Sequence, residues 1–178
     1  FNSTEQMVRS EIRHIPDGSY EGQSWMYYDG FNEGSRFRIK VRITVKDDEI
    51  YFDYSGTDGQ TEGFANAPLG ASVSAIILTF LMLIDPAIPH NDGLTRPLHI
   101  HIPVGTFLNA SFPAATTFGN SITGPNADAI LKALSKALPE RVTAGWNRML
   151  ALAVSGFDPR FNRPYVDILF NALKGGSG

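Results

Sequence analysis

The sequence predicts an α+β fold in which an antiparallel β meander is followed by buried helices and short strands. Three patterns support this class. Apolar and polar residues alternate strictly over residues 36–46, which is typical of a half-buried strand. An almost continuous apolar stretch covers residues 69–84, and apolar residues at helical spacing cover residues 125–138. Because strands come first and helices alternate with short strands later, the order favours α+β over a doubly wound sheet.

Length and composition are typical of one globular domain. The chain has 178 residues, of which 43% are hydrophobic and 19% charged, and this excludes a disordered or fibrous protein. The net charge is −3, from 15 Lys and Arg against 18 Asp and Glu. This balance offers nothing that would attract nucleic acid or an anionic membrane. The absence of cysteine excludes disulfides and thiolate metal sites and is consistent with a cytoplasmic location.

The two ends of the sequence predict that it is an internal fragment of a longer subunit. The chain opens on Phe1 rather than on methionine and shows no signal-peptide pattern. It closes on a glycine-rich segment, residues 174–178. We expect a single domain over residues 1–178.

The first predicted elements are a short helix and three strands. Residues 4–14 predict a helix capped by Ser3 or Thr4. Its apolar stripe comprises Met7, Val8 and Ile12. The three strands cover residues 20–28, 36–46 and 49–55, and the short turns between them predict a meander.

The most apolar stretch, residues 69–84, predicts a buried helix rather than a membrane span. A span needs about 20 predominantly apolar residues, so this stretch is too short. Pro86 ends it, because the residue before a proline avoids the helical conformation.

The remaining elements alternate in type. They are a short strand over residues 98–102, a continuation over residues 106–110, a helix over residues 125–138, and two strands over residues 146–154 and 165–173 joined by the loop 157–162.

No strong catalytic or cofactor motif is present. The glycine-rich loop 56–60 lacks the lysine of a phosphate-binding loop, and no nucleophile elbow occurs. His99 and His101 share one face of a strand and are spaced for chelation, but without a third ligand this pattern favours an exposed strand face. No metal ligand and no catalytic residue are assigned.

Polar residues in loops give weaker candidates for contact with a ligand or a partner protein. Asp53, at a strand end, is either a general base or orienting group, or a solvated residue that caps the loop. Asparagines beside Gly, Pro or Thr either satisfy loop backbone or contact a ligand. The candidates are Asp53, Gln60, Asn66, Asn91, Arg96 and Asn120.

Arg96 lies in a constrained loop, residues 91–97. Gly93 is expected to supply a positive φ, and Pro97 keeps Arg96 out of the helical conformation. The Arg96 guanidinium then either fixes the loop through Asp92 or Asp85, or contacts a partner subunit or an anionic intermediate.

Longer strings in the sequence resemble the hydantoinase B/oxoprolinase family. They include IPDGSYE at residues 15–21, IYFDYSGTDGQ at 50–60, NDGLTRP at 91–97, FPAA at 112–115 and ALPERV at 137–142. These strings occur in the expected order and cover nearly the whole chain.

The resemblance implies that this chain is part of the B-type subunit of an ATP-dependent cyclic-amide hydrolase of the hydantoinase or 5-oxoprolinase type. Such a subunit acts on a small molecule together with a hydantoinase A-like partner and the rest of its own B-type polypeptide. Two alternatives stay open. The parent protein is an ATP-dependent ketone carboxylase of the acetone or acetophenone type, or the chain is a non-catalytic scaffold or interaction domain.

The resemblance also implies where the cofactors belong. ATP with Mg lies in the partner subunit, and a divalent metal is bound by a portion that would precede Phe1. No cofactor is therefore expected on this chain, and the isolated chain is expected to be inactive.

Overall fold

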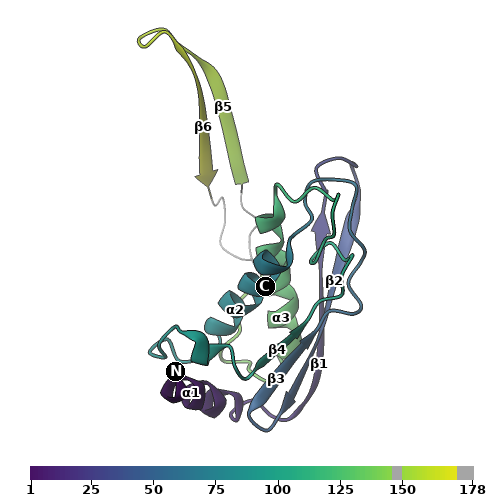
Figure 1. The fold of residues 1–178 in the computed structure, drawn as a ribbon, viewed down its shortest axis with the longest axis vertical. Helices are drawn as coiled ribbons and strands as arrows, with labels where there is room; N and C mark the ends of the chain where they lie inside the picture. The colour runs from purple at the N-terminus through teal and green to yellow at the C-terminus, as the bar shows by residue number, and fades with distance from the viewer. Residues whose placement is uncertain (146–149, 172–178) are drawn as a thin grey trace. The chain divides into compact units, whose positions relative to one another are not determined.

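The computed structural model describes residues 1–145 and 150–171, and the chain divides into two compact units (Figure 1). The first unit, Phe1–Thr143, holds a four-stranded sheet and three α-helices. The second unit, Ala144–Gly178, contains a β-hairpin. This mixed architecture confirms the predicted α+β class. The expectation of a single domain stays a prediction.

The predicted meander is confirmed. β1 (Gly18–Tyr27), β2 (Arg36–Lys46) and β3 (Glu49–Asp53) pair antiparallel in that order. β4 (Leu98–His101) pairs with β3 in parallel orientation at the edge of the sheet. A parallel neighbour requires a long crossover, and the segment that contains helix α2 (Leu69–Leu81) supplies it.

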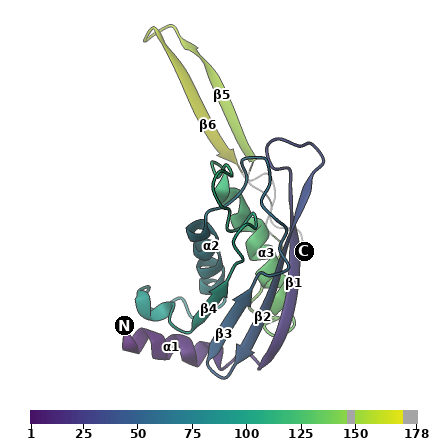
Figure 2. The ribbon, with the colours of Figure 1, turned by 45° about the vertical axis from the view of Figure 1, so that its right-hand side comes forward.

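The alternation along β2 places one apolar face toward the helices. Ile39, Val41 and Ile43 are fully buried. α3 (Thr123–Leu134) packs against β1 and β2, and both views show α2 and α3 on the same side of the sheet (Figure 2). The core of the first unit therefore lies between the sheet and α3, with α2 in a further layer.

The helix predicted over residues 69–84 is present as α2 (Leu69–Leu81), and it is buried on one face only. Its covered face comprises Ser72, Ala75, Ile76, Thr79 and Phe80. Leu78, by contrast, is 56% exposed, and Leu69 and Met82 are also exposed. Because α2 forms the outer layer, α3 covers only one of its sides. Apolar composition alone could not show this, since the exposed face is apolar as well. Within residues 1–145 and 150–171, no helix has the length and apolar character to cross a membrane.

α1 (Asn2–Ile12) buries Val8 and Ile12 as predicted, whereas Met7 is exposed. The predicted cap by Ser3 or Thr4 is wrong, because Phe1 is the N-cap residue and supplies no side-chain cap. Thr4 is buried instead, and its hydroxyl accepts a hydrogen bond from Asn91 at 2.9 Å. A long-range contact has replaced the local cap.

Shorter elements complete the first unit. The 3-10 helices η1 (Asp92–Leu94) and η2 (Gly119–Ile122) precede β4 and α3. The predicted strand over residues 106–110 is a turn with isolated bridges that pair Thr106 with Gly59 and Asn109.

The second unit contains the predicted pair of strands. β5 (Leu150–Asp158) and β6 (Arg163–Asn171) pair antiparallel through nine residue pairs. The four-residue loop between them closes at Asn162, which has a φ of 50°. The predicted strand residues 146–149 and 172–173 lie outside the described residues.

We predict that Phe80→Ala lowers the free energy of unfolding by about 3–5 kcal/mol, because Phe80 is fully buried on the covered face of α2. Leu78→Ala, on the exposed face of the same helix, should change it by less than about 1 kcal/mol. Urea denaturation of the two variants measures both values. Equal losses would contradict the assignment of the two helix faces.

Candidate functional site

The candidate residues separate into two groups and one isolated residue. Gln60 and Asn66 lie in the loop between β3 and α2, which bonds to the segment before η2, and Asn120 lies in η2. Asn91 and Arg96 lie beside α1. Asp53 stands apart at the end of β3.

Asn66 closes the first group of loops from a fully buried position. Its Oδ1 accepts from the Thr61 backbone N–H at 2.7 Å. Its Nδ2 donates to the backbone carbonyls of Thr61, Gly63 and Ala115, at 3.0, 2.9 and 3.0 Å. Both amide hydrogens are thus committed to loop backbone, which supports the structural interpretation of this asparagine.

Gln60 joins the same loops. Its Oε1 accepts from the Ser111 backbone N–H at 2.9 Å, and its own backbone N–H donates to the Gly105 carbonyl at 2.8 Å. Asn120 is exposed on η2. Of the three, Gln60 and Asn120 are exposed, and Asn66 alone is buried.

Asp29 is a buried carboxylate outside the set of candidates chosen from the sequence. Its Oδ1 accepts from the backbone N–H groups of Phe31 and Asn32, at 3.0 and 2.8 Å. Burial alone would raise the pKa of Asp29, but the hydrogen bonds from Asn32 and Phe31 outweigh it and lower the pKa. The carboxylate therefore stays ionised and orders the loop after β1. In the sequence, the Asp29-Gly30 pair is the feature that could have identified this position.

Aromatic side chains lie exposed around this loop. We define the aromatic rim as Phe31, Phe64 and Phe118, all exposed. The rings of Phe64 and Phe118 meet edge to face, with centroids 6.1 Å apart. Gly30 has a φ of 91° and lies so close to Phe64 that a Cβ would come within 2.1 Å of its ring. In the sequence, the feature that could have identified this rim is phenylalanine within otherwise polar loops.

Asp53 caps the chain after β3. Its Oδ1 accepts from the Ser55 backbone N–H at 3.0 Å and from the Ser55 hydroxyl. Burial acts to raise the pKa of Asp53, but the Ser55 hydrogen bonds, together with His101 and Arg42, lower it. A lowered pKa makes a carboxylate a weaker base, so the arrangement supports capping rather than general-base chemistry.

The two strand histidines lie on the exposed face of the sheet. His99 stacks on Tyr51 with centroids 4.4 Å apart, and its Nε2 is 3.4 Å from Glu49 Oε2. His101 is the register partner of Asp53. Among the residues that the structure describes, no three or more His, Cys, Asp or Glu side chains gather as a metal site.

Asn91 and Arg96 anchor α1. Asn91 Oδ1 accepts from the Gly93 backbone N–H, and Arg96 Nη1 lies 2.8 Å from Glu5 Oε2 and 3.1 Å from Asn2 Oδ1. The structural tie that the sequence predicts is therefore present, but it joins Arg96 to α1 rather than to Asp92 or Asp85.

Gly93 serves a different purpose from the one expected. The sequence predicts a positive φ, but the positive-φ glycines of the described chain do not include it. A Cβ at Gly93 would lie 2.2 Å from the Phe1 carbonyl oxygen. Glycine is needed here because the N-terminus approaches the loop backbone closely.

Further ion pairs fix α1 to the sheet turn and to the segment after α3. Arg9 Nη1 lies 2.9 Å from Asp48 Oδ1, and Arg141 Nη1 lies 2.7 Å from Glu11 Oε2. Hydrogen bonds from Arg96 and Arg9 lower the pKa of Glu5. Most charged side chains around α1 are thus engaged in holding the fold together.

Comparison with known proteins identifies the family. All of residues 1–178 match the family model described as hydantoinase B/oxoprolinase. The chain is 33% identical to a protein of Pseudomonas sp. strain NS671 whose name describes the B-type component of a D-/L-hydantoinase, over 100% of this chain and 32% of that protein. It is 32% identical to the beta component of the caprolactamase of Pseudomonas jessenii, over 96% of this chain and 30% of that protein. The chain therefore belongs to the hydantoinase B/oxoprolinase family and spans about a third of the length of these relatives.

Solved structures agree with this assignment. The crystal structure of the ATP-dependent caprolactamase from Pseudomonas jessenii superposes with a TM-score of 0.82 and 30% identity, over 93% of this chain and 28% of that chain. The nucleotide-free acetone carboxylase superposes with a TM-score of 0.77 at 16% identity, over 93% of this chain and 24% of that chain, which shows a shared fold. Relatives in this family include hydantoinase, 5-oxoprolinase and caprolactamase proteins. Because the caprolactamase relative is named as one component among several, its name implies a multi-subunit complex.

We predict that Asn66→Ala destabilises the chain by about 3 kcal/mol or more, because it leaves several buried backbone groups without partners. Asn120→Ala, a matched change at an exposed position, should cost less than about 0.5 kcal/mol. Chemical denaturation measures both. A neutral Asn66→Ala variant would show that this asparagine does not hold the loops.

Proposed function

We propose that this chain is part of the B-type subunit of an ATP-dependent cyclic-amide hydrolase that acts with a hydantoinase A-like subunit. One observation carries the proposal: the chain superposes on part of the ATP-dependent caprolactamase structure with a TM-score of 0.82 at 30% identity. Relatives at 32–33% identity carry hydantoinase and caprolactamase names. Amides are poor electrophiles, and ATP supplies the driving force for opening a ring that is otherwise unreactive.

The role proposed for this chain is that of a scaffold. Asn66, Gln60, Asn91 and Arg96 are engaged in contacts within the chain, and Asp53 caps its own loop. Across the described ranges, no three or more His, Cys, Asp or Glu side chains gather as a metal site. From the family resemblance we propose that ATP with Mg is bound by the A-type subunit and that a divalent metal is bound by another part of the B-type polypeptide.

A ketone carboxylase is the alternative of a different class. The acetone carboxylase likeness, at 16% identity, supports the fold and carries no information about the reaction. The relatives at 30% identity or more favour the hydrolase. The third hypothesis is that the chain is a scaffold or interaction domain of a parent protein that is not an enzyme. An assay of the whole assembly separates all three hypotheses.

We predict that the parent polypeptide, purified with its A-type subunit, releases ADP in the presence of a cyclic amide and opens the ring. The assay offers 5-oxoproline, hydantoin and caprolactam separately, with ADP release and ring-opened product both measured. Residues 1–178 alone should give neither product above a buffer blank.

A parallel reaction with acetone and bicarbonate is the control. ADP release with acetone and bicarbonate, but with none of the cyclic amides, would favour the carboxylase hypothesis over the hydrolase hypothesis. No stimulation by any substrate would favour the non-catalytic hypothesis.

A further inference from the structure

Asn126, in the first turns of α3, is fully buried, and half of its side-chain amide has no hydrogen-bond partner. Its Oδ1 accepts from the Tyr54 hydroxyl at 2.7 Å. Its Nδ2 is buried and finds no partner in the part of the chain that the structure describes. An amide nitrogen carries two N–H donors, and nearly all buried polar groups of native proteins bond to protein or to ordered water. The Nδ2 group therefore requires an acceptor from outside the described residues.

Turning the Asn126 amide over does not remove this requirement. Nδ2 would then donate to the Tyr54 oxygen, and Asn126 Oδ1 would be left without a partner in its place. Burial raises the pKa of Tyr54, so its hydroxyl keeps a proton that needs an acceptor, and Asn126 Oδ1 is that acceptor in the observed orientation. The observed orientation leaves one group unpaired, whereas the reversed one leaves two.

The sheet directs the unpaired nitrogen toward β1. Tyr54 follows β3, and the strands lie in the order β1-β2-β3. Because the oxygen and the nitrogen of a planar amide point in different directions, an oxygen held from the β3 side turns the nitrogen toward β2 and β1. β2 presents Ile39 and Val41 to α3, and these fully buried side chains have no polar atom. On β1, the covered face carries Ser24.

Ser24 supplies a second polar side chain at this contact. It is only 4% exposed, and its register partner on β2 is Ile39. Its hydroxyl donates to the carbonyl of Pro125, the residue directly before Asn126. The oxygen of that hydroxyl still offers lone pairs. A water molecule that accepts from Asn126 Nδ2 can donate to this oxygen, which gives it the two or more polar partners that buried waters have.

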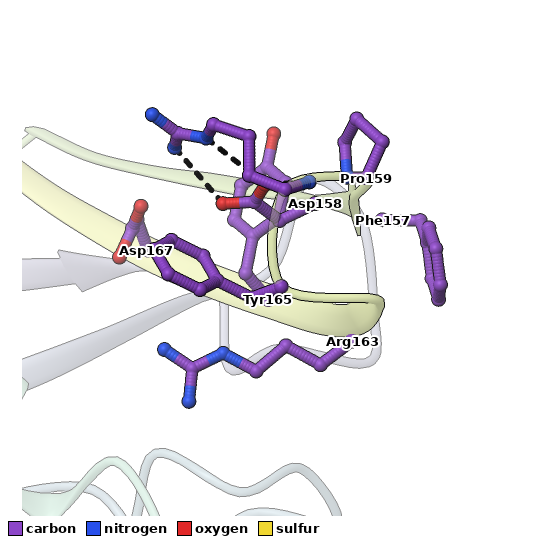
Figure 3. A pocket seen from close by; sticks show the side chains of 8 residues that line it. Phe157, Asp158, Pro159, Arg163, Tyr165 and Asp167 are labelled. Carbon is purple, nitrogen blue, oxygen red and sulfur yellow. Dashed lines mark hydrogen bonds and ion pairs between the residues drawn. The ribbon is translucent and has the colours of Figure 1, made fainter.

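The hollow on the β-hairpin poses no comparable requirement. It has a volume of about 560 Å³, and its lining includes Asp158, Arg163 and Tyr165 (Figure 3). The Arg160 guanidinium, which also lines it, is paired with Asp158 at 2.9 Å. Solvent can satisfy the polar atoms of an open hollow, whereas it cannot reach a buried amide.

We propose that one water molecule is bound between α3 and β1, where it accepts a hydrogen bond from Asn126 Nδ2 and donates one to the Ser24 oxygen. The side chains of Asn126, Ser24 and Tyr54 are uncharged, so the site favours a neutral ligand over an ion. Enclosure between the helix and the sheet limits that ligand to a small one. This inference is independent of the proposed function, because it concerns only contacts within the first unit.

A crystal structure of the unaltered parent polypeptide, at a resolution that shows ordered water, tests the site directly. We expect a water oxygen at roughly 2.7–3.2 Å from both Asn126 Nδ2 and Ser24 Oγ. A direct hydrogen bond between the two side chains, a protein acceptor for Nδ2, or no density beside Nδ2 would overturn the inference.

Hydrogen exchange of α3 in the parent polypeptide measures whether the two side chains are coupled. Ser24→Ala removes one partner of the water, and Asn126→Leu removes the other. Ser24→Ala should accelerate exchange of the α3 backbone amides less in the Asn126→Leu background than in the natural one, by a factor of about three or more. The reason is that Asn126→Leu has already released the water.

Ser72→Ala is the matched control for this coupling. Ser72 is also fully buried and donates to a backbone carbonyl, that of Leu108 at 2.6 Å, but it lies on α2. It should change exchange of α3 by the same factor in both backgrounds, within about twofold. The same equality for Ser24→Ala would contradict the water bridge.

Discussion

The approach of α3 to the sheet at Gly22 is the contact on which the first unit depends. A Cβ at Gly22 would lie 2.0 Å from the Ala129 carbonyl oxygen and 2.7 Å from the Ala133 backbone nitrogen. No side chain larger than hydrogen fits without movement of the helix. The small residues Ala129 and Ala133 on the facing side of α3 match this requirement, so the helix backbone rests almost directly on β1.

Polar contacts then fix the start of α3 over the sheet. The Ser24 hydroxyl donates to the Pro125 carbonyl, and the Tyr54 hydroxyl donates to Asn126 Oδ1 at 2.7 Å. Burial raises the pKa of Tyr54, so its hydroxyl stays protonated and remains a donor. The position of α3 also fixes η2, which precedes it, and the loops around Asn66, because Gly119 of η2 packs against the Asn66 carbonyl. The loops that hold Gln60, Asn66 and Asn120 are thus supported by the core, and the buried polar side chains among them are used to keep these loops in place.

Sequence patterns predicted the elements whose environment is local and missed those whose environment is not. The alternation along β2 predicted its buried face, because successive side chains of a strand alternate between the covered and the exposed face of the sheet. The exposed face of α2 around Leu78 was not predictable, since an apolar residue carries no mark of which layer will cover it. The predicted cap of α1 was wrong for a related reason: the Thr4 hydroxyl accepts a hydrogen bond from Asn91, 87 residues away. For the candidate site, residue type identified Asn66, but only the distances show that its hydrogen bonds are spent on backbone.

The most direct test of this account compares Gly22→Ala with Gly70→Ala by chemical denaturation. The loss of helical structure is the signal that is measured. A Cβ at Gly70 meets nothing within 4 Å, so that change controls for the loss of a glycine. We expect Gly22→Ala to lower the free energy of unfolding by about 3 kcal/mol or more, because the added methyl group overpacks the contact. Gly70→Ala should change it by less than about 1 kcal/mol. Equal stability of the two variants would contradict the claim that the contact between β1 and α3 organises the fold.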